Sequence, residues 1–254
     1  TLNNLTLTTG TLTVDAGVTI TINGTLTISG GTLTNSGTIS YGTNGILVYN
    51  TGGNYTGTSL EWPASSGPRD VTIQTAGTNV NLPGNRTITG TLTLTAGLLS
   101  IGSNTLTLNG TITISAGKLL GSATSNLTIG GTGGTLSFDQ TSAATRSLNN
   151  LTLNSGSSVA TLGTDLDVYG TIDLTTSSGA TLNLAGQRLT LRSLSTGTAR
   201  IANLTGCTLN NATNVTMERY IPAPTVGGAA TGGRRYRLLA PTVSTTTTIN
   251  AHWQ

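Results

Sequence analysis

The 254-residue sequence contains few of the residue types on which most active sites depend. Charged side chains make up 7% of the chain, and there is one histidine and one cysteine. The single cysteine, Cys207, excludes an intrachain disulfide, and we expect it to be a small buried hydrophobic residue. The single histidine, His252, leaves no zinc site built from spaced histidines and no Ser/His/Asp set. We therefore expect no cofactor and no enzymatic activity.

Long apolar runs are also missing. No stretch approaches the ~20 consecutive apolar residues that a membrane-spanning helix needs, so we expect no membrane span. Hydrophobic residues nevertheless make up 35% of the chain. This fraction, combined with so little charge, argues against intrinsic disorder and favours a folded protein.

Apolar and hydroxyl side chains alternate through much of the sequence, as in "SNTLTLNGTITISAG" at 103–117. In an extended chain Leu106, Leu108, Ile112 and Ile114 all lie on one face. The threonines between them lie on the other. Both the period of two and the many β-branched residues predict strands with one buried face and one hydroxyl face.

Short phrases of this kind recur along the chain, which indicates a repeat architecture. "GTLTV" begins at 10, "GTLTI" at 24, "GTLTL" at 90 and "GTITI" at 110. A longer echo joins "TINGTLTISGG", from 21, to "TLNGTITISAG", from 107. A second similarity, at an offset of about 80 residues, relates the segment that begins at 70 to the segment that begins at 150.

These features predict an all-β fold, a parallel β-solenoid with a short C-terminal β element. Leucine, isoleucine and valine would form a thin core, and Gly and Asn would form the corners. With roughly 20 residues in each turn, residues 1–214 would make about ten turns and a rod ~50 Å long. A β-sandwich is the alternative, since short strands separated by turns also describe that fold.

Two regions depart from the alternating pattern. Residues 50–70 contain Trp62 and two prolines, which do not fit the interior of a β-ladder, so we expect a loop that leaves the rod. Residues 215–254 are rich in arginine and tyrosine and are expected to form a β-hairpin or the start of a further domain. The candidate interaction surface comprises Arg219, Tyr220, Arg234, Arg235, Tyr236, Arg237 and Trp62.

Positive charge is concentrated at the C-terminal end. Residues 1–187 carry four basic against seven acidic residues, a net of about −3, whereas residues 188–254 carry seven arginines against Glu218, a net of about +6. The arginines are predicted to pair or to stack on aromatic rings where a terminal domain packs, and the alternative is that they bind an acidic polymer or surface. We do not expect nucleic acid as a partner.

One group of acidic residues merits consideration as a metal or catalytic site. In "TDLDVYGTID", Asp165, Asp167 and Tyr169 are expected on one outward face, and Asp173 follows on the next strand. Clustered carboxylates can bind calcium or perform acid/base chemistry. With no second cluster beside it, a solvated face is the simpler interpretation, and Asp165, Asp167 and Asp173 form a weak candidate for a metal site.

Three segments carry a resemblance to a known group of proteins. "EWPASSGPRDVTI", "LTLTAGLLSIGSNTLTLNGTI" and "MERYIPA…RRYRLLAPTV…INAHWQ" resemble repeat regions of very large secreted surface proteins of Bacteroidota that the type IX secretion system exports. The resemblance implies an adhesin-like β-solenoid outside the cell. Those proteins end in a C-terminal sorting domain that the sequence lacks, so we expect a fragment or a processed chain.

The sequence thus predicts a non-enzymatic extracellular stalk, fibre or adhesin segment at the cell surface. Uncapped strand edges at its ends would permit end-to-end assembly with itself, and flanking domains or surface glycans are other expected partners. A glycan-binding or carbohydrate-active β-helix is the alternative, and carboxylates and aromatic residues gathered on one outer face would favour it. A minor alternative is ice binding by a regular threonine array.

Overall fold

The structure is a computed structural model that describes residues 1–174, 178–202 and 204–220, together with two short strands at 225–226 and 229–230. The chain divides into two compact units, Thr1–Tyr220 and Ile221–Gln254. No helix occurs among the described residues. The second unit contributes an antiparallel pair, β30 (Thr225–Val226) and β31 (Ala229–Ala230).

The first unit consists of stacked, almost entirely parallel strands. Its long sheet contains β1 (Leu2–Leu7), β3 (Thr19–Ile28), β5 (Thr38–Tyr41), β6 (Ile46–Tyr49), β8 (Asp70–Ile73), β11 (Thr91–Leu94), β14 (Thr111–Ile114), β17 (Gly133–Leu136), β20 (Val159–Leu162), β23 (Thr181–Asn183) and β28 (Thr208–Asn210). A six-stranded sheet contains β10 (Arg86–Ile88), β13 (Thr105–Leu108), β16 (Asn126–Ile129), β19 (Asn150–Leu153), β22 (Thr171–Asp173) and β27 (Arg200–Ile201).

Shorter sheets complete the coil. One four-stranded sheet contains β7 (Asn54–Thr56), β9 (Asn79–Asn81), β12 (Leu98–Ser100) and β15 (Lys118–Leu120), and the other contains β18 (Ser147–Leu148), β21 (Leu166–Val168), β24 (Leu189–Leu191) and β29 (Val215–Met217). The two-stranded sheets are β2 (Thr11–Val14) with β4 (Thr32–Asn35), and β25 (Ser193–Leu194) with β26 (Gly197–Thr198).

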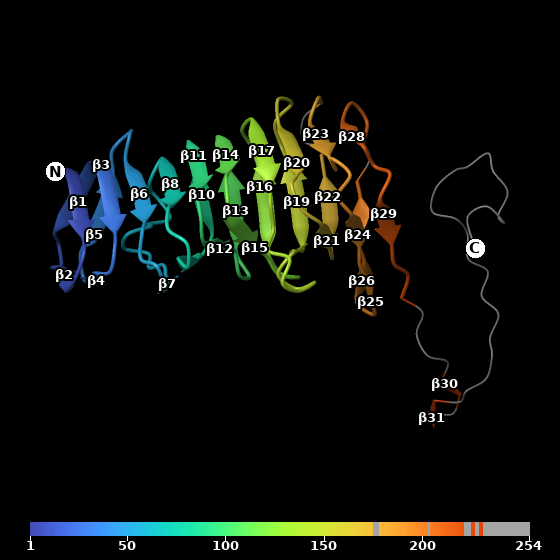
Figure 1. Cartoon of the computed structure of the whole chain (residues 1–254), viewed down its shortest axis with the longest axis horizontal. Helices are drawn as coiled ribbons and strands as arrows, with labels where there is room; N and C mark the ends of the chain where they lie inside the picture. Colours follow the sequence, from blue (N-terminus) through green and yellow to red (C-terminus); the bar gives the residue numbers. More distant parts are fainter. Residues whose placement is uncertain (175–177, 203, 221–224, 227–228, 231–254) are drawn as a thin grey trace. The chain divides into compact units, whose positions relative to one another are not determined.

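These strands wind as a parallel β-solenoid, which confirms the predicted fold class (Figure 1). From β8 onwards the chain leaves the long sheet, passes through a four-stranded sheet, passes through the six-stranded sheet and returns to the long sheet. The path of the long sheet from β1 to β28 contains ten strands and therefore nine axial steps. All its pairings are parallel, as a coil that always turns in one sense requires.

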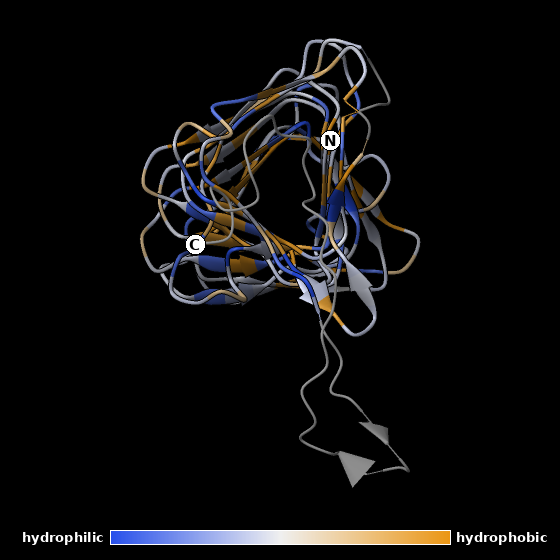
Figure 2. Cartoon of the chain, turned by 90° about the vertical axis from the view of Figure 1, so that its right-hand side faces the viewer, coloured by the Kyte–Doolittle hydropathy of each residue, from blue (hydrophilic) through white to orange (hydrophobic). Residues whose placement is uncertain are grey.

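The core is a narrow column of aliphatic side chains inside the coil. Viewed along the coil, the strands surround this column (Figure 2), and the apolar side chains that point inward are buried. One inward row consists of residues paired in register from turn to turn, Leu26, Leu47, Val71, Leu92 and Ile112, each at most 3% exposed. Full burial of such a side chain stabilises the fold by about 1.5–3 kcal/mol. The alternation that the sequence showed therefore separates the core from the hydroxyl surface.

Turns differ in length while the register is kept. Leu92 pairs with Ile112 twenty residues later, whereas Leu182 pairs with Leu209 twenty-seven residues later. Extra residues are accommodated at the corners, where glycines allow neighbouring turns to approach closely. A Cβ atom at Gly110 would lie 1.9 Å from the carbonyl oxygen of Gly90 in the preceding turn.

The region 50–70 differs from the expectation of a loop that leaves the rod. It contains β7, which pairs with β9 in a four-stranded sheet, and its residues Leu60, Glu61 and Trp62 are at most 5% exposed. Burying the large, mostly apolar Trp62 side chain in the core stabilises the fold, whereas exposing it to solvent would not. Beyond β7, the exposed residues of this region are Ser59, Ala64, Ser65, Ser66 and Arg69.

The solenoid also extends past residue 214. Val215–Met217 forms β29 and pairs with β24, so this segment is part of the coil rather than of a C-terminal element. The antiparallel pair β30–β31 lies within residues 215–254, for which the sequence predicted a β-hairpin or the start of a further domain.

Candidate functional sites on the outer faces

The outer face of the long sheet carries rows of hydroxyl groups. One outward row runs through Thr6, Thr27, Val48, Thr72, Thr93, Thr113, Thr135, Thr161, Asn183 and Asn210. The neighbouring outward row is less uniform and contains Ile46, Asp70, Gly133 and Val159 among its threonines. The surface is thus polar and nearly uncharged, but its hydroxyl array is interrupted.

Hydroxyl groups also bond to one another between turns. Oγ1 atoms of Thr11 and Thr32 lie 3.0 Å apart, and those of Thr13 and Thr34 lie 3.1 Å apart. Each hydroxyl can both donate and accept, so such a ladder can satisfy itself without charge. These contacts are exposed, and their role is to cover the coil with a neutral hydrogen-bonding surface.

Charge is concentrated instead on the second four-stranded sheet. We define the charged face as Arg146, Asp165, Asp167, Arg188, Arg192 and Glu218, which lie in or next to β18, β21, β24 and β29. Four of them, Arg146, Asp167, Arg192 and Glu218, form a chain of ion pairs from turn to turn. Nη2 of Arg192 lies 2.7 Å from Oδ2 of Asp167, and its Nη1 lies 2.6 Å from Oε1 of Glu218.

Asp167 is the centre of this arrangement. By alternation it points outward between Leu166 and Val168, yet its side chain is fully buried beneath the arginines. Oδ2 accepts hydrogen bonds from Nε of Arg146 at 3.3 Å and from Nη2 of Arg192 at 2.7 Å, whereas Oδ1 has no hydrogen-bond partner. A buried carboxylate requires such partners, because desolvating an unpaired charge costs several kcal/mol.

Asp165 forms a second, more exposed pair on the same face. Its Oδ2 lies 3.1 Å from Nη2 of Arg188, with side-chain exposures of 31% and 39%. Oδ1 also accepts a hydrogen bond from the backbone N–H of Arg188 at 2.9 Å. Solvent screens this pair more than it screens Asp167.

The weak metal candidate is not assembled by the fold. Asp165 and Asp167 both pair with arginines, while Asp173 lies in β22 of the six-stranded sheet, on another side of the coil. Within residues 1–174, 178–202 and 204–220, no three metal-ligating side chains come together. The charged face therefore offers arginine–carboxylate pairs rather than free carboxylates.

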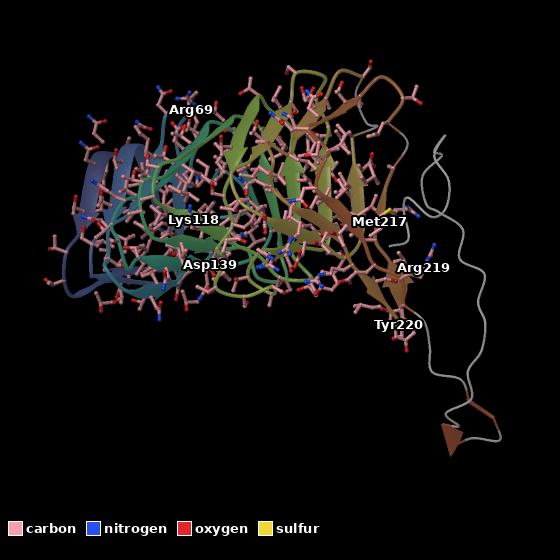
Figure 3. All side chains as sticks on the ribbon, turned by 45° about the vertical axis from the view of Figure 1, so that its right-hand side comes forward. Arg69, Lys118, Asp139, Met217, Arg219 and Tyr220 are labelled. Atoms are coloured by element: carbon pink, nitrogen blue, oxygen red, sulfur yellow. The ribbon has the colours of Figure 1, made fainter. Side chains whose placement is uncertain are left out.

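The candidate interaction surface is dispersed. Trp62 does not belong to it, since the side chain is fully buried; the expectation is wrong because the segment packs into the core. Arg219 and Tyr220 are exposed at the C-terminal end of the described coil, with Tyr220 46% exposed, and Met217 lies near them (Figure 3). Arg234, Arg235, Tyr236 and Arg237 lie outside the described residues.

A buried polar cluster surrounds Trp62, and sequence reasoning missed it. Glu61 is fully buried, and its carboxylate accepts hydrogen bonds from the backbone N–H and hydroxyl of Thr58 and, at 3.4 Å, from the hydroxyl of Tyr49. Burial raises the pKa of Glu61 above its usual value, although these hydrogen bonds act in the opposite direction. Burial likewise raises the pKa of Tyr49.

Arg86 is the cationic member of this cluster and is 5% exposed. Its Nε donates to the carbonyl oxygen of Trp62 at 2.6 Å, and its Nη2 donates to Oγ of Ser59 at 3.0 Å. Burial lowers the pKa of the guanidinium. The signal in the sequence was Arg86-Thr87-Ile88, where arginine takes the position of an inward aliphatic residue.

Comparisons with known proteins identify no relative of the chain, so its class is argued from the fold and these surfaces. No family profile, curated protein or solved structure matches the chain. The part of the chain that the structure describes contains no helix long and apolar enough to cross a membrane. Fold and surfaces together define a β-solenoid repeat protein with a hydroxyl coat and one charged face.

Proposed function

We propose that this chain is a non-enzymatic structural segment, a rigid stalk or adhesin repeat on the outside of a cell. The observation that carries the proposal is the long sheet, whose parallel ladder continues from β1 to β28. A coil in which each turn is hydrogen-bonded to the next resists bending, because every axial step is fixed by backbone bonds. Such a segment holds the parts at its two ends at a fixed separation.

The surface chemistry supports the same role. Neutral hydroxyl rows cover the long sheet, so interactions with solvent depend little on salt or pH. The carboxylates of the charged face pair with arginines, which leaves them poorly suited to acid/base catalysis. An extracellular position and export by a type IX system are supported by composition and by the resemblance to Bacteroidota surface proteins.

The partners of this segment are proposed to be flanking domains or a second copy stacked end to end. Half-buried apolar side chains such as Leu5 and Leu12 at one end, and Leu209 and Val215 at the other, lie in the outermost turns. Covering them by a following β-structure would extend the core. Parallel stacking in one direction produces an open filament rather than a closed dimer.

Electron microscopy of the purified chain at several concentrations tests this function. Nine axial steps of ~4.8 Å predict rods of roughly 43 Å for the solenoid. Rods whose length grows with concentration would support end-to-end assembly, and rods of constant length would exclude it while leaving the stalk intact. Compact, isotropic particles would contradict both.

A second candidate function is glycan binding at the charged face, since carboxylates and arginines gather there beside Tyr169, which is half-buried. Partly exposed arginine–carboxylate pairs can share hydrogen bonds with sugar hydroxyls. Titration with neutral oligosaccharides is expected to show saturable binding that Arg188→Ala abolishes and Arg69→Ala, on another face, preserves. Absence of saturable binding would remove this candidate.

Ice binding by a regular threonine array is not proposed, because other residues interrupt the threonine rows.

A further inference from the structure

One side of the coil is interrupted between β7 and β8. In later turns this side is formed by the six-stranded sheet, which begins at β10. In the turn between β7 and β8 the corresponding place is taken by residues 57–69, which contain no strand. Of the described strands, β10 pairs with β13 alone and β5 with β3 alone. The ladder on this side is therefore broken at a single turn.

Side-chain hydrogen bonds and isolated backbone bonds replace the missing ladder. On the N-terminal side, the backbone N–H of Tyr41 donates to the carbonyl oxygen of Ser66 at 2.9 Å, and its hydroxyl donates to the carbonyl oxygen of Glu61 at 2.6 Å. On the C-terminal side, Arg86 donates to the Trp62 carbonyl and to Ser59. The side chains of Tyr41 and Arg86 and the Tyr41–Ser66 backbone bond thus connect the middle of residues 57–69 to the adjoining turns. Backbone bonds from Gly57 to Asn81 and from Arg69 to Gly45 connect its two ends.

The connection requires charge inside the core. Arg86 is in register with Leu106, which is in register with Leu127 and then Leu151, so it occupies the first position of an otherwise aliphatic inward row. Glu61 is buried close by. The groups that face Glu61 are Tyr41, Tyr49, Tyr55 and Arg86. Buried charges recover their desolvation cost only while this geometry is kept.

A ladder and a set of side-chain bonds respond differently to stress. Backbone bonds between two parallel strands support one another, and the aliphatic row beneath them packs without polar atoms. Around residues 57–69, loss of the Arg86 contacts with Trp62 and Ser59 leaves a buried guanidinium without these partners. Local opening free energies differ within one protein, and segments held by few contacts open first.

We propose that residues 57–69 form a release point in the rod, the axial connection that opens before any other when the solenoid is loaded or destabilised. The inference rests on the proposed stalk function, in which tension along the axis must pass through every turn. Towards the following turn the load is carried by the β7–β9 and β8–β11 ladders and the Arg86 contacts. Towards the preceding turn it is carried by the β6–β8 ladder and the Tyr41 contacts, because β4 and β7 do not pair. Opening there would leave the turns from β10 onwards folded as a unit.

Hydrogen exchange of the full chain tests the release point. The amides of β5 and β10 are expected to exchange at least about tenfold faster than those of β16 and β19. Arg86→Lys keeps the charge but loses the planar set of donors, so it should accelerate exchange at β5, at β10 and at residues 57–69 while β16 and β19 keep their rates. Arg69→Lys, at an exposed arginine that ends the same segment, should leave all rates unchanged.

A second test measures how accessible Trp62 is to solvent as the pH changes. Burial holds the pKa of Glu61 above its unfolded value, so this carboxyl stabilises the closed segment below the unfolded pKa, and the stabilisation is lost as pH rises through the folded pKa. In a chain with Trp253→Phe, which leaves Trp62 as the single tryptophan, quenching of its fluorescence by a soluble quencher should increase over that range. With Glu61→Gln, which cannot ionise, the increase should disappear.

Uniform exchange along the coil, or equal effects of Arg86→Lys and Arg69→Lys, would overturn the release point. Quenching that rises with pH equally in Glu61→Gln would also contradict the role of the buried carboxyl. Either result in a chain that still forms rods would leave the stalk function standing. Loss of the rod itself would instead refute the stalk.

Discussion

Replacing Gly110 with alanine is expected to destabilise the solenoid by about 3 kcal/mol or more. The new Cβ would lie 1.9 Å from the carbonyl oxygen of Gly90, 2.6 Å from its carbonyl carbon and 3.0 Å from its Cα. All three are backbone atoms, so no side-chain rotation can relieve the overlap. The turns would have to separate, which would strain the hydrogen bond from the N–H of Thr111 to the carbonyl of Gly90.

Urea unfolding checks this expectation through the shift of the midpoint. Gly53→Ala is the matched control, because a Cβ at Gly53 meets nothing within 4 Å and its backbone does not adopt a positive φ. The control should unfold at or slightly above the wild-type midpoint. Equal midpoints for the two variants would mean that turns do not approach as closely at this corner as the structure shows.

Replacing Asp167 with alanine is the second change with a large expected effect. The substitution leaves Arg146 and Arg192 facing each other without the carboxylate that both contact, although their side chains are only 18% and 23% exposed. Removing one member of a buried ion pair typically costs 3–5 kcal/mol, and partial exposure of the arginines places this case near about 3 kcal/mol.

The comparison with Asp165→Ala isolates the contribution of burial. Asp165 contacts Arg188 with 31% and 39% of the side chains exposed, so its loss should cost less than about 1 kcal/mol. Both variants remove one negative charge from the same strand region, and net charge is therefore matched. If the two midpoints in urea agree, Asp167 is not the centre of the charged face.

The strands and the inward rows were predictable because they depend on a local pattern. Alternation alone assigns Leu106 and Leu108 to the core, where they are at most 1% exposed. The echo between 21 and 107 also has a structural meaning, since Leu26 and Ile112 are four register steps apart along the long sheet. A repeat that returns to the same side of the coil preserves both face and register.

The echo at an offset of about 80 residues does not have this meaning. It aligns Val71 with Leu151, but Val71 lies in β8 of the long sheet and Leu151 in β19 of the six-stranded sheet. All sides of the coil use the same apolar–hydroxyl phrase, so sequence similarity alone cannot distinguish them. Turn lengths vary as well, and a fixed period therefore predicts the fold but not the position of each strand.

Tertiary contacts account for what the sequence could not predict. Trp62 and the two prolines of its segment suggested a projecting loop, yet the segment packs inward. Tyr41 there donates to the carbonyl oxygen of Glu61, and Arg86 donates to the carbonyl oxygen of Trp62. Asp167 was expected on a solvated face and is buried because arginines from neighbouring turns cover it. Both outcomes depend on residues twenty or more positions apart, which no local pattern records.

The central claim is that residues 1–220 form one rigid, parallel coil, and a distance between two spin labels tests it most directly. Labels at Thr6 and Thr161, after replacement of Cys207, would lie seven register steps apart on one outward row. At ~4.8 Å for each step the account predicts a narrow distribution near about 34 Å. A broad distribution, or a distance far below this value as in a β-sandwich, would contradict it.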